Sequence, residues 1–152
     1  MIIAAIRLYE KRSSEARSFF ARKHKTSKFV ICTTVINEIE NLPGLSSDER
    51  GKALKLVHDL CEGQIEEVDP SITKLSEELL NRVNEILIHT DDPRCATLND
   101  MVLLALATSR GYRVVTIDYK TLHGIEWAIK RALLEFGCHY SSRLLTAPEW
   151  EL

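Results

Sequence analysis

The sequence contains no hydrophobic run that could cross a membrane and no stretch with the character of a signal peptide. The longest apolar run, Met101 to Ala107, has seven residues, whereas a transmembrane helix needs about 20. Residues 1–6 are apolar, but they lack the basic region and the length of a secretory leader. We therefore expect a soluble protein of the cytoplasm that has no membrane partner.

Closely spaced cysteines and glycine-rich loops are also missing. The four cysteines lie far apart and none forms a C-x-x-C pair, which argues against a zinc ribbon or a dithiol redox site. They are Cys32, Cys61, Cys95 and Cys138. We expect three or four buried thiols, with a disulfide as the alternative in a hyperthermophilic source. The lack of a glycine-rich phosphate-binding loop argues against a nucleotide-dependent enzyme.

The length and composition indicate an ordinary globular protein. The chain has 152 residues, of which 45% are hydrophobic and 28% are charged, and we expect a single domain over residues 1–152 with a full core. The net charge is −2, but residues 1–28 contain eight basic and two acidic side chains, so this part carries +6 and the rest carries −8. The basic part predicts either a surface that faces phosphates or the solvated face of one helix.

Short strand-like segments alternate with helix-like segments along the chain. The expected strands are Ile2–Ile6, Lys28–Thr33, Gln64–Val68, Tyr112–Ile117 and Leu144–Thr146. A helix capped by Ser13 or Ser14 is expected to carry Ala16, Phe19 and Phe20 inward. Further helices are expected over Thr34–Leu42, Thr97–Arg110 and Ile125–Phe136. Two more are expected after the start signals Ser46-x-x-Glu49 and Asp69-Pro70. Because such alternation favours a parallel sheet with helices on both faces, the sequence predicts an α/β fold of three layers, α/β/α, with a central parallel sheet of four or five strands.

A carboxylate on an apolar helix face is the clearest anomaly in the sequence. Glu38 shares the helical spacing of Val35, Ile39 and Leu42, which form an inward stripe. A carboxylate on a buried face needs a partner, because removing a lone charge from water is costly. A metal ion is one such partner. The alternative is that Glu38 lies at the edge of the stripe and pairs with a lysine.

Two aspartates lie at the ends of expected elements. Asp100 opens an alanine-rich helix, and Asp118 directly follows a valine-rich strand. Each has a structural alternative, since Asp100 can be the third helical residue after a Thr97 cap and Asp118 can start a turn. In a parallel sheet, however, Glu38, Asp100 and Asp118 are all expected near the carboxyl edge, where ligands bind in open α/β folds.

Three carboxylates at one edge repel each other unless a cation holds them. Hard divalent ions with oxygen ligands, Mg²⁺ or Mn²⁺, fit such a site best. An ion of this kind can polarise a phosphate and lower the pKa of a bound water for in-line attack. The sequence therefore predicts hydrolysis of phosphodiester bonds, and the basic N-terminal part can hold a nucleic-acid backbone.

With these residues, the sequence resembles the PIN-domain family. The similar segments are 33–39 (TTVINEI), 99–107 (NDMVLLALA), 114–118 (VVTID) and 144–149 (LLTAPE), in the family's order and over essentially the whole chain. The resemblance implies an endoribonuclease that uses Mg²⁺ or Mn²⁺, with Glu38, Asp100 and Asp118 as its metal-binding and catalytic acids. It also implies RNA as substrate, a homodimer and, in members that are toxins, an antitoxin-like protein partner.

One position departs from the family's pattern. The family's first acid is an Asp at the end of the first strand, and the corresponding residue here is Ala4 or Ala5. Asp91, Asp92 or Glu40 are the candidates to replace it. The alternative to an active ribonuclease is therefore a PIN-like module that binds RNA or a protein partner without catalysis.

Overall fold

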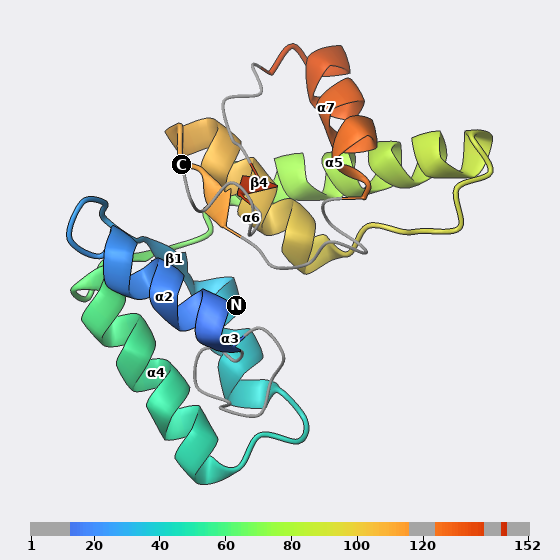
Figure 1. The fold of residues 1–152 in the computed structure, drawn as a ribbon. Coiled ribbons are helices and arrows are strands. Elements are labelled where there is room, and N and C mark those ends of the chain that lie inside the picture. Colours follow the sequence, from blue (N-terminus) through green and yellow to red (C-terminus); the bar gives the residue numbers. More distant parts are fainter. Residues whose placement is uncertain (1–12, 116–123, 139–143, 146–152) are drawn as a thin grey trace. The chain divides into compact units, whose positions relative to one another are not determined.

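A computed structural model describes residues 13–115, 124–138 and 144–145 (Figure 1). The chain divides into two compact units, Met1–Glu67 and Val68–Leu152. The single domain expected over residues 1–152 stays a prediction. Within these described ranges, no helix has the length and apolar character needed to cross a membrane.

The first unit contains three helices and one pair of short strands among its described residues. These are α2 (Ser13–Lys23), β1 (Ile31–Cys32), α3 (Thr33–Asn41), α4 (Ser47–Cys61) and β2 (Ile65–Glu66). The strands are parallel, with Ile31 opposite Ile65 and Cys32 opposite Glu66. Since β1 runs directly into α3, this helix begins at the carboxyl end of its strand, as the sequence predicted.

Aromatic rings pack together beside α2. The buried side of this helix carries Ala16, Phe19 and Phe20, which are the three residues that its sequence pattern pointed inward. The ring of Phe29 lies edge-on to both phenylalanines, with centroids 6.1 Å from Phe19 and 5.6 Å from Phe20. Such edge-to-face contacts add to the stability from burial, so the connection between α2 and β1 is anchored at Phe29.

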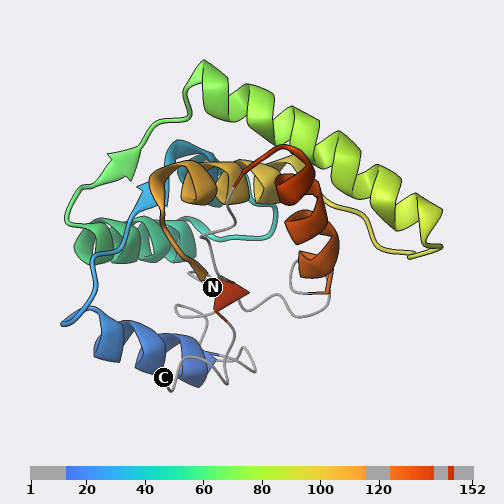
Figure 2. The same cartoon turned by 90° about the horizontal axis from the view of Figure 1, so that it is seen from above.

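The second unit is built around three helices that bury their apolar sides against one another. Its elements are α5 (Pro70–His89), α6 (Leu98–Arg110), β3 (Val114–Val115), α7 (Glu126–Glu135) and β4 (Leu144–Leu145). Helix α5 lies against α6 and α7 (Figures 1 and 2). The fully buried centre includes Leu79, Val83, Met101, Leu104, Ile129 and Leu133. Val114 of β3 lies at the margin of this cluster and is only partly buried.

The predicted helix ends are confirmed by their hydrogen bonds. At the start of α4, the backbone N–H of Glu49 donates to the Ser46 hydroxyl at 3.1 Å, and the Ser46 N–H donates to Glu49 Oε2 at 3.0 Å. Asp69 accepts from the backbone of Ser71 at the start of α5, with proline at the first helical position. Gly111 directly follows the last residue of α6 and adopts a φ of 71°, which glycine tolerates without strain.

The prediction of three layers around a central parallel sheet of four or five strands is wrong. In the parts of the chain that the structure describes, most residues are helical. Each strand there has only two residues, and the strands form two separate parallel pairs. The physical reason is that the apolar stripes of α5, α6 and α7 are long enough to bury one another, so no sheet is needed to cover them. The expected strand Ile2–Ile6 lies outside the described residues.

The cysteine prediction is partly wrong. Cys32 and Cys61 are buried, but Cys138 is only partly buried and Cys95 is exposed. All four thiols are free, so the disulfide alternative is also not realised. Cys95 follows the Asp92–Arg94 ion pair in a surface loop, where no apolar neighbours enclose it.

Candidate functional site

Glu38 lies on α3, and its side chain is exposed. The sequence pattern placed it on an inward stripe with Val35, Ile39 and Leu42, but Ile39 is the only fully buried member of that stripe. Leu42 is the residue after the helix and is 38% exposed. The stripe is therefore narrower than predicted, and the Glu38 carboxylate is accessible from solvent.

Asp100 is the third residue of α6, after the N-cap Thr97. The backbone N–H of Asp100 donates to Thr97 Oγ1 at 3.3 Å, and the Thr97 hydroxyl donates to Asp100 Oδ2 at 2.6 Å. The capping role that the sequence offered as an alternative is thus confirmed. The carboxylate is half-buried, and its orientation is set by the hydroxyl of Thr97.

The predicted trio is not assembled within the described residues. Asp118, together with Ala4 and Ala5, lies outside them, while Glu38 belongs to the first unit and Asp100 to the second. Over the part of the chain that the structure describes, no three or more His, Cys, Asp or Glu side chains form a group suited to a metal ion.

Asp92, one of the candidates to replace the family's first acid, lies in the loop after α5 and forms an ion pair with Arg94. Both carboxylate oxygens of Asp92 accept hydrogen bonds from Arg94, at 2.8 Å from Nε to Oδ1 and 2.5 Å from Nη2 to Oδ2. These bonds hold the pKa of Asp92 at about 2. A metal ion would have to displace the guanidinium from Asp92. Asp91 is exposed and adopts a left-handed φ of 54°, and Glu40 is exposed on α3.

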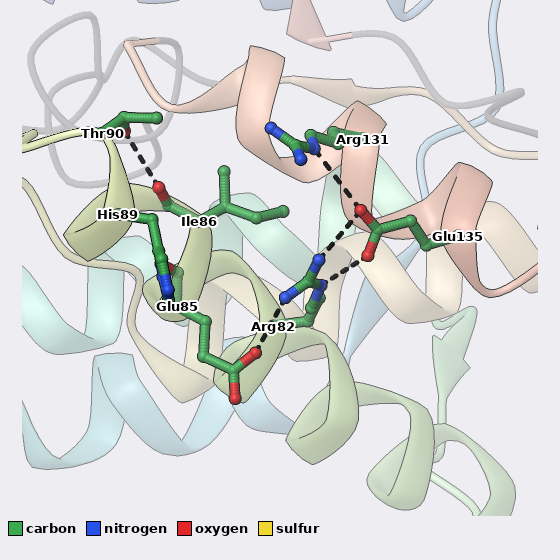
Figure 3. A network of polar contacts seen from close by, with 7 residues as sticks. All are labelled: Arg82, Glu85, Ile86, His89, Thr90, Arg131 and Glu135. Carbon is green, nitrogen blue, oxygen red and sulfur yellow. Dashed lines mark hydrogen bonds and ion pairs between the residues drawn. The ribbon is translucent and has the colours of Figure 1, made fainter.

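A cluster of charged side chains joins α5 to α7 (Figure 3). Arg82 binds Glu135 through two guanidinium nitrogens and also donates to Glu85 at 2.9 Å. Arg131 approaches Glu135 at 3.4 Å from its own helix. Because every member pairs with an opposite charge, this cluster is a link between helices and offers no open ligand position.

A basic hollow in the first unit was only partly visible from the sequence. It lies between residues 24–29, after α2, and the end of α4 with Glu62 and Gln64. The cation-rich segment His24–Lys28 was the signal in the sequence. The contributions of Phe29 and Gln64 were missed, because they depend on the approach of α4 to a segment more than thirty residues earlier in the chain.

Comparisons with protein-family models, curated proteins and solved structures give no match to the chain. Any functional assignment must therefore come from the chain's own residues.

Proposed function

We propose that the chain is a cytoplasmic endoribonuclease that hydrolyses RNA phosphodiester bonds with Mg²⁺ or Mn²⁺. Its metal-binding and catalytic acids are Glu38, Asp100 and Asp118, the residues assigned by the resemblance to the PIN-domain family. The observation that carries the proposal is the oriented carboxylate of Asp100 at the start of α6. Carboxylates that bind metals are themselves held by hydrogen bonds from a second layer of residues, and Thr97 supplies such a bond.

The length of the chain between Asp100 and Asp118 supports a shared site. Helix α6 ends at Arg110 with Gly111 as its C-cap, and β3 then contacts the same helix. The ten residue steps along the helix from Asp100 to Arg110 rise about 15 Å. The four residue steps from Val114 to Asp118 cover at most about 13 Å for any chain of that length. The chain is therefore long enough to bring the two carboxylates close together.

Glu38 supplies the third carboxylate from a different element. It stands five residues after Thr33, the first residue of α3, or about 8 Å from Thr33 along the helix axis. Its exposure allows it to bind an ion while it stays in contact with water. A divalent ion on these oxygens, when bound, would polarise the scissile phosphate and lower the pKa of a water ligand.

Calorimetric titration with Mn²⁺, paired with an RNA cleavage assay, tests this function. We expect the parent chain to bind Mn²⁺ and to cleave RNA only with divalent metal. Asp100→Asn and Asp118→Asn are each expected to weaken binding and to lower cleavage at least 100-fold, since the loss of an outer-shell partner alone already costs about 10–100-fold. Asp59→Asn is the matched control, since Asp59 is exposed on α4 and belongs to none of the segments that resemble the family. Cleavage without divalent metal, or equal activity of all variants, would overturn the proposal.

A module that binds RNA or a protein without catalysis is the second candidate. The alanine at the position of the family's first acid favours it, because a missing ligand weakens metal binding. This candidate predicts that RNA or partner binding persists in EDTA while no condition gives turnover. Metal-dependent turnover that is lost in Asp118→Asn would exclude it.

A further inference from the structure

The basic hollow of the first unit combines positive charge with an open surface. Residues 22–28 carry Arg22, Lys23, Lys25 and Lys28, and the sequence has no acidic residue between Ala16 and Asn37. Lys25 and Lys28 are exposed and line the hollow. Within the described residues, neither ammonium group pairs with a carboxylate. Like charges gathered in this way attract an anionic partner.

Stabilisation of the end of α2 explains only part of this charge. Arg22 and Lys23 lie in the last turn of the helix, where cations interact favourably with the helix dipole. Lys25 and Lys28 lie beyond the helix, and the dipole effect fades within one turn. The helix dipole therefore does not account for the position of these two lysines.

An aromatic ring lies on the wall beside the lysines. Phe29 lines the hollow and is only partly buried, while its ring packs edge-on against Phe19 and Phe20. The two buried rings limit the movement of Phe29. An immobilised ring with an open surface, next to positive charge, is the arrangement on which unpaired bases stack.

Polar groups complete the lining. Thr26 and Ser27 carry hydroxyls and Gln64 carries an amide, and all three are exposed around the hollow. Such groups can bond to 2′-hydroxyls and to base edges in single strands. Burial raises the pKa of the neighbouring Cys61 thiol, so this group stays neutral near pH 7 and adds no negative charge.

We propose that this hollow binds single-stranded RNA, with backbone phosphates on Lys25 and Lys28 and one unpaired base against Phe29. The choice of RNA rests on the proposed function, whereas the position of the surface rests on the charge, the ring and the polar groups above. Among the described residues that line the hollow, Glu62 is the one acidic residue. Its carboxylate opposes a phosphate, so its removal is expected to strengthen binding.

Fluorescence anisotropy with a labelled single-stranded RNA, measured in EDTA from 50 to 200 mM salt, tests the surface. For the double variant Lys25→Gln/Lys28→Gln we expect roughly tenfold weaker binding at the lower salt and a salt slope smaller by about 1.4, since each phosphate contact on a single strand contributes about 0.7. The double variant Lys52→Gln/Lys55→Gln is the control, because it removes the same charge from exposed positions on α4.

Two further variants separate stacking from charge. Phe29→Leu keeps an apolar side chain and is expected to weaken binding at least fivefold with an unchanged salt slope. Glu62→Gln is expected to tighten binding. Circular dichroism of each variant checks that the helices remain folded.

Equal losses in the two double-lysine variants would overturn the proposal, as would an unchanged affinity in Phe29→Leu. Because EDTA removes divalent ions, RNA binding is measured independently of cleavage. Binding that depends on Lys25 and Lys28 in a chain without turnover would keep the surface and reject the ribonuclease.

Discussion

At the scale of single residues, Thr97 connects the stability of α6 to the orientation of Asp100. Its hydroxyl accepts from the backbone of Asp100 and donates to the carboxylate of the same residue. A cap of this kind contributes about 1 kcal/mol to folding. One side chain therefore serves both a structural role and the proposed metal site, and the two roles can be measured separately.

For Thr97→Ala we expect a loss of about 1 kcal/mol in the free energy of unfolding and at least tenfold weaker binding of Mn²⁺, because the ligand is no longer held in place. Ser46→Ala is the matched control, since Ser46 is the N-cap of α4. It should lower stability by a similar amount and leave Mn²⁺ affinity unchanged. Urea unfolding and calorimetry give the two quantities. An unchanged Mn²⁺ affinity in Thr97→Ala would show that the cap is purely structural.

At the scale of secondary-structure elements, the contact between α5 and α7 combines a buried apolar seam with the ion pairs of Figure 3. The hydrogen bonds from Arg82 lower the pKa of Glu135 below its ordinary value. A carboxylate with a lowered pKa in the folded state stabilises that state above its unfolded pKa. This stabilisation is lost as the pH falls through the folded-state pKa.

We therefore expect Glu135→Gln to lower the melting temperature at pH 7, and we expect the difference from the parent chain to shrink as the pH falls below the ordinary pKa of glutamate. The effect should be modest, because both partners are about one-third exposed and water screens the pair. Glu77→Gln on the exposed side of α5 is the control and should differ little from the parent at any pH. A difference for Glu135→Gln that persists undiminished at low pH would exclude the ion pair as its cause.

At the scale of the whole molecule, the division into two compact units makes it important to measure whether both units unfold in one cooperative transition. Both tryptophans, Trp127 and Trp150, belong to the second unit in the sequence, whereas helices occur in both units. Tryptophan fluorescence thus reports on one unit, and circular dichroism reports on the two together. A chain that folds as a single domain gives coincident transitions with the two probes.

Leu104→Ala provides the perturbation for this test. Leu104 is fully buried in the core of α5, α6 and α7, and its truncation should cost about 2–5 kcal/mol. If the chain folds as the predicted single domain, the unfolding transitions followed by fluorescence and by circular dichroism should both shift to lower denaturant concentration by the same amount. If the fluorescence transition moves while part of the dichroism transition stays in place, the units unfold separately. Leu134→Ala is the control, because Leu134 is 68% exposed.

Local features of the fold could be predicted from the sequence, and non-local ones could not. The start of α4 at Ser46 and the inward pair Phe19 and Phe20 were predicted, because capping and helical spacing depend on residues three or four apart. The sequence left open whether Glu38 is buried or lies at the edge of its stripe, since this depends on what packs against α3. The sequence could name the acidic residues of the site but not how they are arranged in space. Asp118 lies outside the described residues.

Local sequence patterns specify the ends of the helices and the basic segment after α2. The burial of α5, α6 and α7 against one another, with short parallel strand pairs among the described residues, depends instead on the tertiary structure. It also decided that Phe29 and Gln64 line a hollow with Lys25 and Lys28. Hydrogen bonds at helix ends are formed by neighbours in the chain, whereas packing partners come from distant positions whose pairing no local pattern specifies.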